Sequence, residues 1–232
     1  MSGGARGRTV LIAGATSASG LAAARALVDA GARVVAVGRD AAKLDALARA
    51  VVAEPGAGPA IRTAECDLGV EGDVRALAEA LRADRVRVDG ILHLVGGWRG
   101  GGGLAGQSDA DYRALEVGLT ALRHVTRAFW EDLAASDAAR CAIVSSTAVA
   151  RPLAGGANYA AVKAAEEAWA RAMAQGFAKD ARDGARELRA ASVVFRVRAL
   201  AGLEDTLAAR FAGLWDAEAS AINDAVVELD AG

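Results

Sequence analysis

Three side chains in the middle of the sequence have the residue types and the spacing of a proton-transfer site. Tyr159 and Lys163 are four residues apart at the start of a predicted helix, so their side chains share one face of it. A free phenol has a pKa of about 10, and a nearby ammonium lowers that value because it favours the phenolate. Ser146, thirteen residues before Tyr159, ends a predicted strand and offers a hydroxyl to an oxygen that gains negative charge. Together the three groups suit proton exchange with a carbonyl or an alcohol, whereas a tyrosine and a lysine at this spacing alone are usually a surface pair.

A second candidate site is the glycine-containing turn near the N-terminus. The stretch VLIAGATSASGLAAARAL begins as an apolar strand, turns at Gly14 and continues as a helix around Gly20. Glycine permits a tight turn at the first position and close packing of helix against strand at the second, and the N–H groups that open a helix can bind a phosphate. The turn therefore predicts a pyrophosphate site, with a tight turn that binds nothing as the alternative. The predicted contacts are Gly14, Thr16, Ser17, Ala18, Ser19 and Gly20.

The elements that must position these residues alternate regularly along the chain. Short continuous apolar runs are typical of strands buried on both faces of a parallel sheet. The predicted strands are Thr9–Ala13, Arg33–Val37, Ile61–Cys66, Gly90–Val95, Cys141–Ser145, Ala190–Phe195 and Ala225–Leu229. The predicted helices are Ser19–Ala30 (capped at Gly31), Asp40–Ala53, Glu71–Ala83, Asp109–Ala135 and Asn158–Lys179. This alternation predicts an α/β fold: a Rossmann-type doubly wound parallel sheet of about seven strands with helices on both faces.

We expect residues 1–232 to form one domain of this Rossmann type, which binds a dinucleotide and also carries the candidate catalytic groups. The two linker-like stretches, Glu54–Pro59 and Gly96–Gly103, are short and lie between predicted elements. In an open parallel sheet the ligand crevice lies beyond the carboxyl ends of the strands. The turn at Gly14 belongs to that edge, and so does Ser146.

These residues resemble the short-chain dehydrogenase/reductase family, in its short single-domain branch. The segment SSTAVARPLAGGANYAAVK matches the Ser…Tyr-x-x-x-Lys pattern of the family without gaps. The resemblance implies that Tyr159 is the general acid/base, that Ser146 donates to the substrate oxygen, and that Lys163 tunes Tyr159 and binds the nicotinamide ribose. Ser145 is the neighbouring alternative to Ser146.

The first turn resembles the family's TGxxxGxG less completely. Gly14 and Gly20 match, Ala13 replaces the threonine, and Ala18 stands at the middle glycine. The extended branch of the family uses GxxGxxG, which would put Ser17 at that middle glycine. The length of the chain favours the short branch.

The end of the second predicted strand indicates NADP(H) as the cofactor. An acidic side chain there would accept from the ribose 2′-OH of NAD, whereas an arginine can hold the 2′-phosphate of NADP. In VVAVGRD, Gly38 leaves the acidic position empty and Arg39 follows, although Arg39 could also be an ordinary surface residue before a helix capped by Asp40. The resemblance makes Asp67 a partner of the adenine amino group, unless it only caps a helix. The further cofactor contacts that the resemblance implies are Leu68, Gly96, Tyr159, Lys163 and Val197.

Three positions depart from the family's pattern. HLVG, starting at His93, replaces the family's NNAG, so His93 is either a core histidine or binds the backbone as asparagine does. Gly118 replaces an asparagine whose main chain holds a water for proton relay, and it leaves a gap where a side chain packs. No Pro-Gly follows the sixth strand; residues 198–219 there are predicted to form a short substrate lid. Phe211 and Trp215 in it either line an apolar pocket or pack on the sheet.

Composition excludes several other classes of protein. The formal net charge of −2 provides no electrostatic footprint for nucleic acid or for an anionic membrane. Cys66 and Cys141 are predicted to be reduced core thiols, and two histidines cannot form a conventional His-rich metal site, so no metal is expected. The N-terminus lacks the apolar core of a signal peptide and no apolar run is long enough to cross a membrane. We therefore expect a cytoplasmic protein.

The predicted function is NADP(H)-dependent hydride transfer to or from a small-molecule carbonyl or secondary alcohol, as in a ketoreductase or a 3-oxoacyl reductase. The alternatives are a catalytically weakened NADP(H)-binding sensor or non-catalytic subunit, which Gly118 and the missing Pro-Gly favour, and a scaffold that binds no nucleotide. The helices Asp109–Ala135 and Asn158–Lys179 resemble those through which the family forms homodimers and homotetramers. Trp130 and Trp169 would lie in such an interface or in the core.

Overall fold

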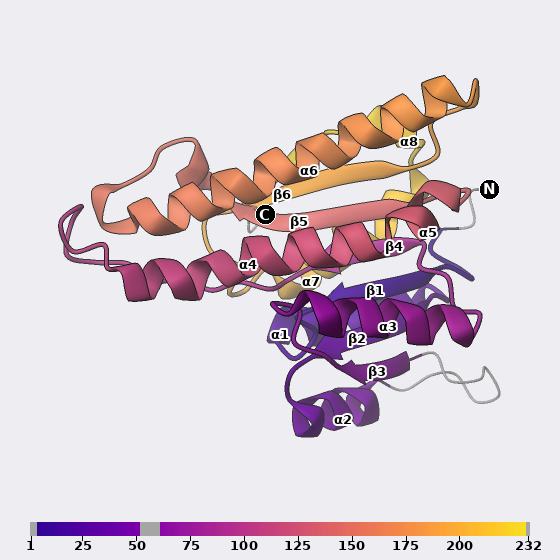
Figure 1. The fold of residues 1–232 in the computed structure, drawn as a ribbon, viewed down its shortest axis with the longest axis horizontal. Helices are drawn as coiled ribbons and strands as arrows, with labels where there is room; N and C mark the ends of the chain where they lie inside the picture. Colours follow the sequence, from indigo (N-terminus) through magenta and orange to yellow (C-terminus); the bar gives the residue numbers. More distant parts are fainter. Residues whose placement is uncertain (1–3, 52–60, 231–232) are drawn as a thin grey trace.

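The computed structural model describes residues 4–51 and 61–230, and within these ranges it contains a doubly wound α/β sheet (Figure 1). Seven parallel strands lie in the order β3-β2-β1-β4-β5-β6-β7. The strands are β1 (Thr9–Ala13), β2 (Arg33–Gly38), β3 (Ile61–Glu65), β4 (Gly90–His93), β5 (Arg140–Ser146), β6 (Ala191–Val197) and β7 (Val226–Leu229). The predicted Rossmann-type fold is confirmed. The candidate linker Glu54–Pro59 lies outside the described residues, and Gly96–Gly103 belongs to the loop after β4.

Helices cover both faces of the sheet because its central strands are apolar on both sides. Along β1, Val10 and Ile12 belong to the core under one face, whereas Leu11 and Ala13 belong to the core under the other. Helices α1, α2 and α7 contribute to the first core, and α3, α4, α5 and α6 contribute to the second. Their bounds are α1 (Ala18–Asp29), α2 (Ala41–Ala50), α3 (Glu71–Ala83), α4 (Asp109–Ala128), α5 (Trp130–Ala135), α6 (Ala157–Asp183) and α7 (Glu204–Ala212), and a short α8 (Ala219–Ile222) precedes β7.

The predicted helix Asp109–Ala135 is wrong in one respect, since the chain forms two helices there. Phe129, with φ −105° and ψ 7°, separates α4 from α5 and is fully buried. Burial of this ring in the core outweighs continuation of the helical period. Most other predicted boundaries hold to within two residues; α6, however, ends four residues later than expected, at Asp183.

Local capping explains where the first helices begin and end. The Ser17 hydroxyl accepts from the N–H of Gly20 at the start of α1, and Asp40 accepts from the N–H of Lys43 at the start of α2. After α1, Gly31 has φ +81° and its N–H donates to Val28, which ends the helix as predicted.

The long helices α4 and α6 lie side by side across one face, and their N-terminal parts extend past the carboxyl ends of β5 and β6 (Figure 1). Trp130 stacks on Phe177 with ring centroids 4.7 Å apart, and the indole N–H of Trp169 donates to Thr126 at 2.9 Å. Both tryptophans are therefore partly buried between helices of the same chain. In the described ranges no helix is long and apolar enough to span a membrane.

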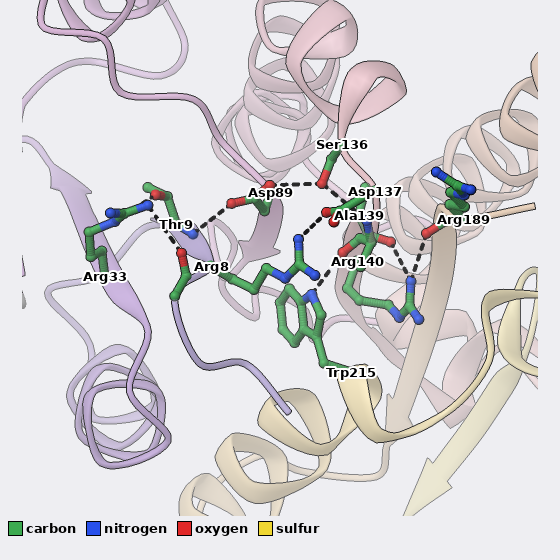
Figure 2. A network of polar contacts seen from close by, with 12 residues as sticks. Arg8, Thr9, Arg33, Asp89, Ser136, Asp137, Ala139, Arg140, Arg189 and Trp215 are labelled. Carbon is green, nitrogen blue, oxygen red and sulfur yellow. Dashed lines mark hydrogen bonds and ion pairs between the residues drawn. The ribbon is translucent and has the colours of Figure 1, made fainter. Parts of the chain in front are cut away.

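A polar cluster ties the amino-terminal edge of the sheet together (Figure 2). Asp89 accepts from the N–H of Thr9 at 2.9 Å and from the hydroxyl of Ser136 at 2.7 Å. Beside it, the Trp215 indole donates to the carbonyl of Ala138 at 2.8 Å, and Arg140 donates to several carbonyls. These hydrogen bonds join the starts of β1 and β5 to the segments before β4 and after α7.

Candidate active site

The turn between β1 and α1 excludes side chains at both of its outer glycines. Gly14 has φ +85°, and a Cβ there would lie 3.0 Å from the backbone of Leu94 and Val95. A Cβ at Gly20 would lie 2.0 Å from the carbonyl oxygen of Ala15. The expected tight turn and close helix packing are both present, so the N-terminus of α1 faces the carboxyl edge of the sheet.

Two cavities open at this edge, and they share Ser17, Leu94, Val95 and Gly96. The larger, of about 1110 Å³, is lined by Ser146, Tyr159 and Lys163, together with Ser19 and Val197. The smaller, of about 260 Å³, is lined by Gly14, Thr16, Gly38, Arg39, Asp67 and Leu68. The predicted catalytic and cofactor residues thus lie along one crevice. Ala18 and Gly20 line neither cavity, since Ala18 is exposed on α1 and Gly20 packs against the turn.

Successive side chains of β5 point to opposite faces of the sheet, so the two candidate serines have different surroundings. Ser146, the last residue of the strand, lines the larger cavity, and its hydroxyl accepts from the N–H of Ala148 at 3.1 Å. The hydroxyl of Ser145 instead donates to Glu167 at 2.7 Å and is fully buried. Ser146 is therefore the serine available to a molecule in the cavity.

The ammonium group of Lys163 donates to two acceptors. Its Nζ donates to the carbonyl oxygen of Val144 at 2.9 Å and to Glu166 Oε2 at 2.7 Å. Lys163 is 8% exposed and Glu166 only 1%, so this ion pair lies in the protein interior. Burial raises the pKa of Glu166, and the adjacent ammonium opposes that rise.

Gly118 provides the space for this carboxylate. A Cβ at Gly118 would lie 2.6 Å from Glu166 Oε1 and 3.1 Å from the carbonyl oxygen of Val95. The expectation that Gly118 leaves a gap is therefore wrong, because the side chain of Glu166 from α6 fills it.

His93 combines the two roles considered for it. The ring is 2% exposed and its Nε2 lies 3.0 Å from the carbonyl oxygen of Gly118, so it binds the backbone of α4 while being part of the core. Burial, together with the charge of Lys163, lowers the pKa of His93 to about 3. The ring is thus neutral near pH 7, and Nδ1 is buried without a hydrogen-bond partner among the described residues.

At the smaller cavity, the side chain of Thr16 packs closely against Gly38. A Cβ at Gly38 would lie 3.0 Å from the Thr16 methyl group, so an acidic side chain at this position would crowd the turn. Arg39 is exposed at the rim. Asp67 accepts from the N–H of Gly69 at 2.9 Å, which shapes the turn after β3, whereas α3 begins after Val70.

The segment 198–219 divides into two parts. Arg198, Ala199, Leu200 and Ala201 line the larger cavity. In the rest, the aromatic residues pack inward: Phe211 is fully buried, Trp215 is 5% exposed, and their rings meet edge to face at 5.5 Å. Of the two uses considered for these aromatic residues, packing on the sheet is the one observed.

Sequence reasoning missed two acidic residues on α6. Glu166 holds Lys163, and Glu167 binds Arg196 of β6 through both oxygens, at 2.8 and 2.6 Å, in addition to Ser145. Burial acts to raise the pKa of Glu167, but the hydrogen bonds from Arg196 and Ser145 outweigh it and lower the pKa. The signal was available, because residue i+3 from Lys163 shares its helix face.

A third missed residue is Gln107, which joins the two loops at the mouth of the cavity. Its amide nitrogen donates to the carbonyls of Gly101, Gly103 and Gly155 at 3.0 to 3.2 Å, and its oxygen accepts from the N–H of Asn158. The loop after β4 is thereby attached to the N-terminus of α6, which carries Tyr159.

Neither metal nor thiol chemistry is evident in the described part of the chain. No group of three His, Cys, Asp or Glu residues there could hold a metal ion. Cys66 and Cys141 are free and buried, as predicted, and burial raises their pKa values to about 11 and about 12.

Comparisons with known proteins agree with this arrangement. The family model of the short chain dehydrogenases matches residues 8–181. A candidate daunorubicin C-13 ketoreductase, DnrU of Streptomyces sp. (strain C5), is 45% identical over 95 residues, which are 41% of this chain but only 32% of that relative. The matched segment thus spans about a third of the relative's length.

Solved structures share the fold over nearly the whole chain. A metagenomic short-chain oxidoreductase in complex with NADP superimposes with a TM-score of 0.82 at 26% identity, covering 98% of this chain and 99% of that one. An NAD⁺-bound xylitol dehydrogenase has a TM-score of 0.83 at 16% identity, with coverage of 98% and 99%. The shared fold therefore occurs with either cofactor.

Proposed function

Because the chain belongs to the short chain dehydrogenase family, we propose that it transfers a hydride between NADP(H) and a small-molecule carbonyl or secondary alcohol. The observation that carries this proposal is that Ser146, Tyr159 and Lys163 line one cavity that reaches the turn before α1. A hydroxyl, a phenol and an ammonium are the groups that such a reaction needs near the substrate oxygen.

A dinucleotide would lie along the crevice formed by the two cavities. The turn at Gly14 and the N-terminus of α1, with Ser17 and Ser19, would hold the pyrophosphate. Arg39 would hold the 2′-phosphate, since Gly38 offers no carboxylate to a ribose hydroxyl and a Cβ there would lie 3.0 Å from the Thr16 methyl group. Asp67 and Leu68 would border the adenine. This set of residues favours NADP(H) over NAD(H).

The chain's own residues supply the proton chemistry, while a bound nicotinamide supplies or accepts the hydride. Ser146 donates a hydrogen bond to the substrate oxygen as negative charge develops on it. Tyr159 gives its phenolic proton to that oxygen in reduction and takes it back in oxidation. The ammonium of Lys163 stabilises the phenolate between these events.

The lining of the larger cavity supports a neutral or anionic substrate. Arg151 and Arg198 are exposed at its rim and no carboxylate lines it among the described residues. Trp98 and Leu153, 69% and 75% exposed, add apolar surface at the mouth. We expect ketones and 3-oxoacyl thioesters to be reduced in preference to cationic ketones.

The test is NADPH oxidation by the purified protein with a panel of neutral ketones, 3-oxoacyl thioesters and cationic ketones. We expect turnover with at least one neutral or anionic substrate. Tyr159→Phe removes the proton donor and should lower kcat at least about 100-fold. Tyr112→Phe is the matched control, because Tyr112 is the other tyrosine of the sequence and does not line the cavity. Full activity in Tyr159→Phe would contradict the assignment.

A catalytically weakened NADP(H)-binding protein is the second candidate. The engagement of Lys163 by Glu166 favours it, since a carboxylate beside the ammonium reduces the field that reaches a phenol. This candidate predicts saturable binding of NADPH, no turnover with the whole panel, and binding that Tyr159→Phe does not change.

We also propose a homodimer or homotetramer assembled through α4 and α6, which lie side by side on one face (Figure 1). Light scattering coupled to size-exclusion chromatography measures the mass directly. A mass equal to that of one chain, 23.4 kDa, would contradict assembly. The cytoplasmic location stays a prediction.

A further inference from the structure

The space between Gly118 of α4 and the proposed catalytic Lys163 is filled by the carboxylate of Glu166 rather than by a side chain from α4. Glu166 Oε1 lies where a Cβ on Gly118 would come within 2.6 Å, and Glu166 Oε2 lies 2.7 Å from Lys163 Nζ. A glycine in the middle of a helix costs about 1 kcal/mol relative to alanine. The absence of a side chain at Gly118 therefore has a specific steric consequence, because it admits Glu166.

The two acceptors on Lys163 leave one donor free. An ammonium has three N–H donors, and the carbonyl of Val144 and the carboxylate of Glu166 engage two of them. Because Lys163 also lines the larger cavity, the third donor is the one available to Tyr159 or to a ligand. Fixing two donors on rigid elements, β5 and α6, restricts the direction of the third.

The groups that face this ion pair come from α4, α6, β4 and β5. The charge of Lys163 acts on Glu166, which is on the same helix, and on His93 of β4. His93 is neutral near pH 7, α4 faces the pair with Gly118, and β5 faces it with the carbonyl of Val144. A buried amine without a counter-charge tends to lose its proton. Glu166 is the group that offsets this tendency.

We propose that Glu166 is the positioning residue of Lys163, which it keeps charged and aimed at the cavity by occupying the space that Gly118 leaves. The catalytic consequence rests on the function proposed above, whereas the charge and orientation of Lys163 can be measured without any substrate. Glu166 touches neither substrate nor cofactor in this assignment and acts through Lys163.

The first experiment observes Lys163 directly in the protein without ligand. The sequence contains three lysines, and Lys43 and Lys179 have side chains that are 68% and 63% exposed. In protein labelled with ¹³C and ¹⁵N in lysine, the Nζ and Cε signals of the buried residue are assigned by their loss in Lys163→Met. We expect a slowly exchanging ammonium in the wild type. In Glu166→Gln its Nζ hydrogens should exchange faster and its Nζ and Cε signals should shift, because the ion pair at 2.7 Å is lost.

The matched control is Glu167→Gln on the next residue of the same helix. Glu167 is also buried but binds Ser145 and Arg196 instead of the lysine. This variant should lower the melting temperature while leaving the Lys163 signals unchanged. Unchanged Lys163 signals and hydrogen exchange in Glu166→Gln, or equal changes in both variants, would overturn the proposal.

The second experiment is kinetic. Glu166→Gln keeps an oxygen acceptor but removes the charge, so kcat should fall about tenfold or more while KM for NADPH and for the ketone changes less than about threefold. Glu167→Gln should not show this split. An unchanged kcat would overturn the proposal, and so would a rise, which would mean that Glu166 cancels the charge of Lys163.

A double-mutant cycle tests the role of Gly118. Gly118→Ala should displace the carboxylate and reproduce the changes of Glu166→Gln in both the lysine spectrum and kcat. In the background of Glu166→Ala the space is vacated, so the added methyl group should change the Lys163 signals little. Equal effects of Gly118→Ala in both backgrounds would assign them to the Val95 carbonyl, 3.1 Å away, and overturn the proposal. If the wild-type protein oxidises no NADPH, the proposed function fails, and the lysine spectra still decide the role of Glu166.

Discussion

Removing the guanidinium of Arg140 should destabilise the fold without altering the carboxyl edge of the sheet. Arg140, the first residue of β5, is 4% exposed and donates to four backbone carbonyls: Ala139, Arg189 and Leu214 at 2.9 Å and Ala217 at 2.7 Å. Figure 2 shows the contacts with Ala139 and Arg189. No carboxylate of the described residues lies within ion-pair distance, and burial lowers the pKa of this arginine. It joins the sheet to the segment after α7.

The expected magnitude follows from these contacts. An acceptor that loses its partner in the interior costs about 1–3 kcal/mol. Arg140→Met also removes a buried charge, and the contacts of one group are not additive. We therefore expect the free energy of unfolding to fall by about 3–5 kcal/mol rather than by the sum over the four hydrogen bonds. Arg140→Lys keeps the charge but has fewer donors, and should lose about half as much.

The assay is equilibrium unfolding in urea, monitored by circular dichroism, with the midpoint and the slope fitted separately. Arg189→Met is the matched control, since the side chain of Arg189 is exposed and only its carbonyl accepts from Arg140; it should change stability by less than about 0.5 kcal/mol. KM for NADPH should stay constant in both variants. An Arg140→Met protein within about 1 kcal/mol of the wild type would refute the reasoning.

Three further outcomes are expected. Arg39→Gln should raise the Kd for NADPH about 10- to 100-fold and leave NADH binding unchanged, whereas Arg49→Gln on α2 should affect neither, as titration of nucleotide fluorescence would show. His93 is neutral when folded, with a pKa of about 3 against 6.5 when unfolded, so the unfolded state binds more protons below pH 6.5 and stability falls as the pH drops from about 6.5 toward 3. In urea titrations, His93→Asn should remove up to about 1.4 kcal/mol per pH unit of that slope. Gly20→Ala should lower the melting temperature and NADPH affinity, because its Cβ would lie 2.0 Å from a carbonyl oxygen, whereas Gly72→Ala, with nothing within 4 Å, should be neutral or stabilising.

The carboxyl edge of the sheet shows what could be predicted from the sequence. Strand and helix periods are local properties, so the order of elements and the parallel sheet followed from them. Once a parallel sheet is assumed, the carboxyl ends of all its strands lie at the same edge. For that reason Gly14, Arg39, Ser146 and Tyr159 could be expected along one crevice, where the cavities occur.

The break at Phe129 shows the first limit of this approach. Helical period continues through the residue, but the ring belongs to the core under α4, α5 and α6. The packing of distant elements decides whether the chain buries this ring or continues the helix through it. The hydrophobic period of the segment carries no information about that packing.

The neighbourhood of Lys163 shows the second limit. The sequence by itself determined that a serine, a tyrosine and a lysine stand at helix and strand ends that meet, because those positions follow from local spacing and sheet geometry. Only the tertiary structure decided that Glu166 fills the space above Gly118 and that Ser145 binds Glu167. The physical reason is steric and electrostatic: a buried carboxylate needs both room and a counter-charge, and here α4 provides the room and α6 the charge, from positions 45 or more residues apart.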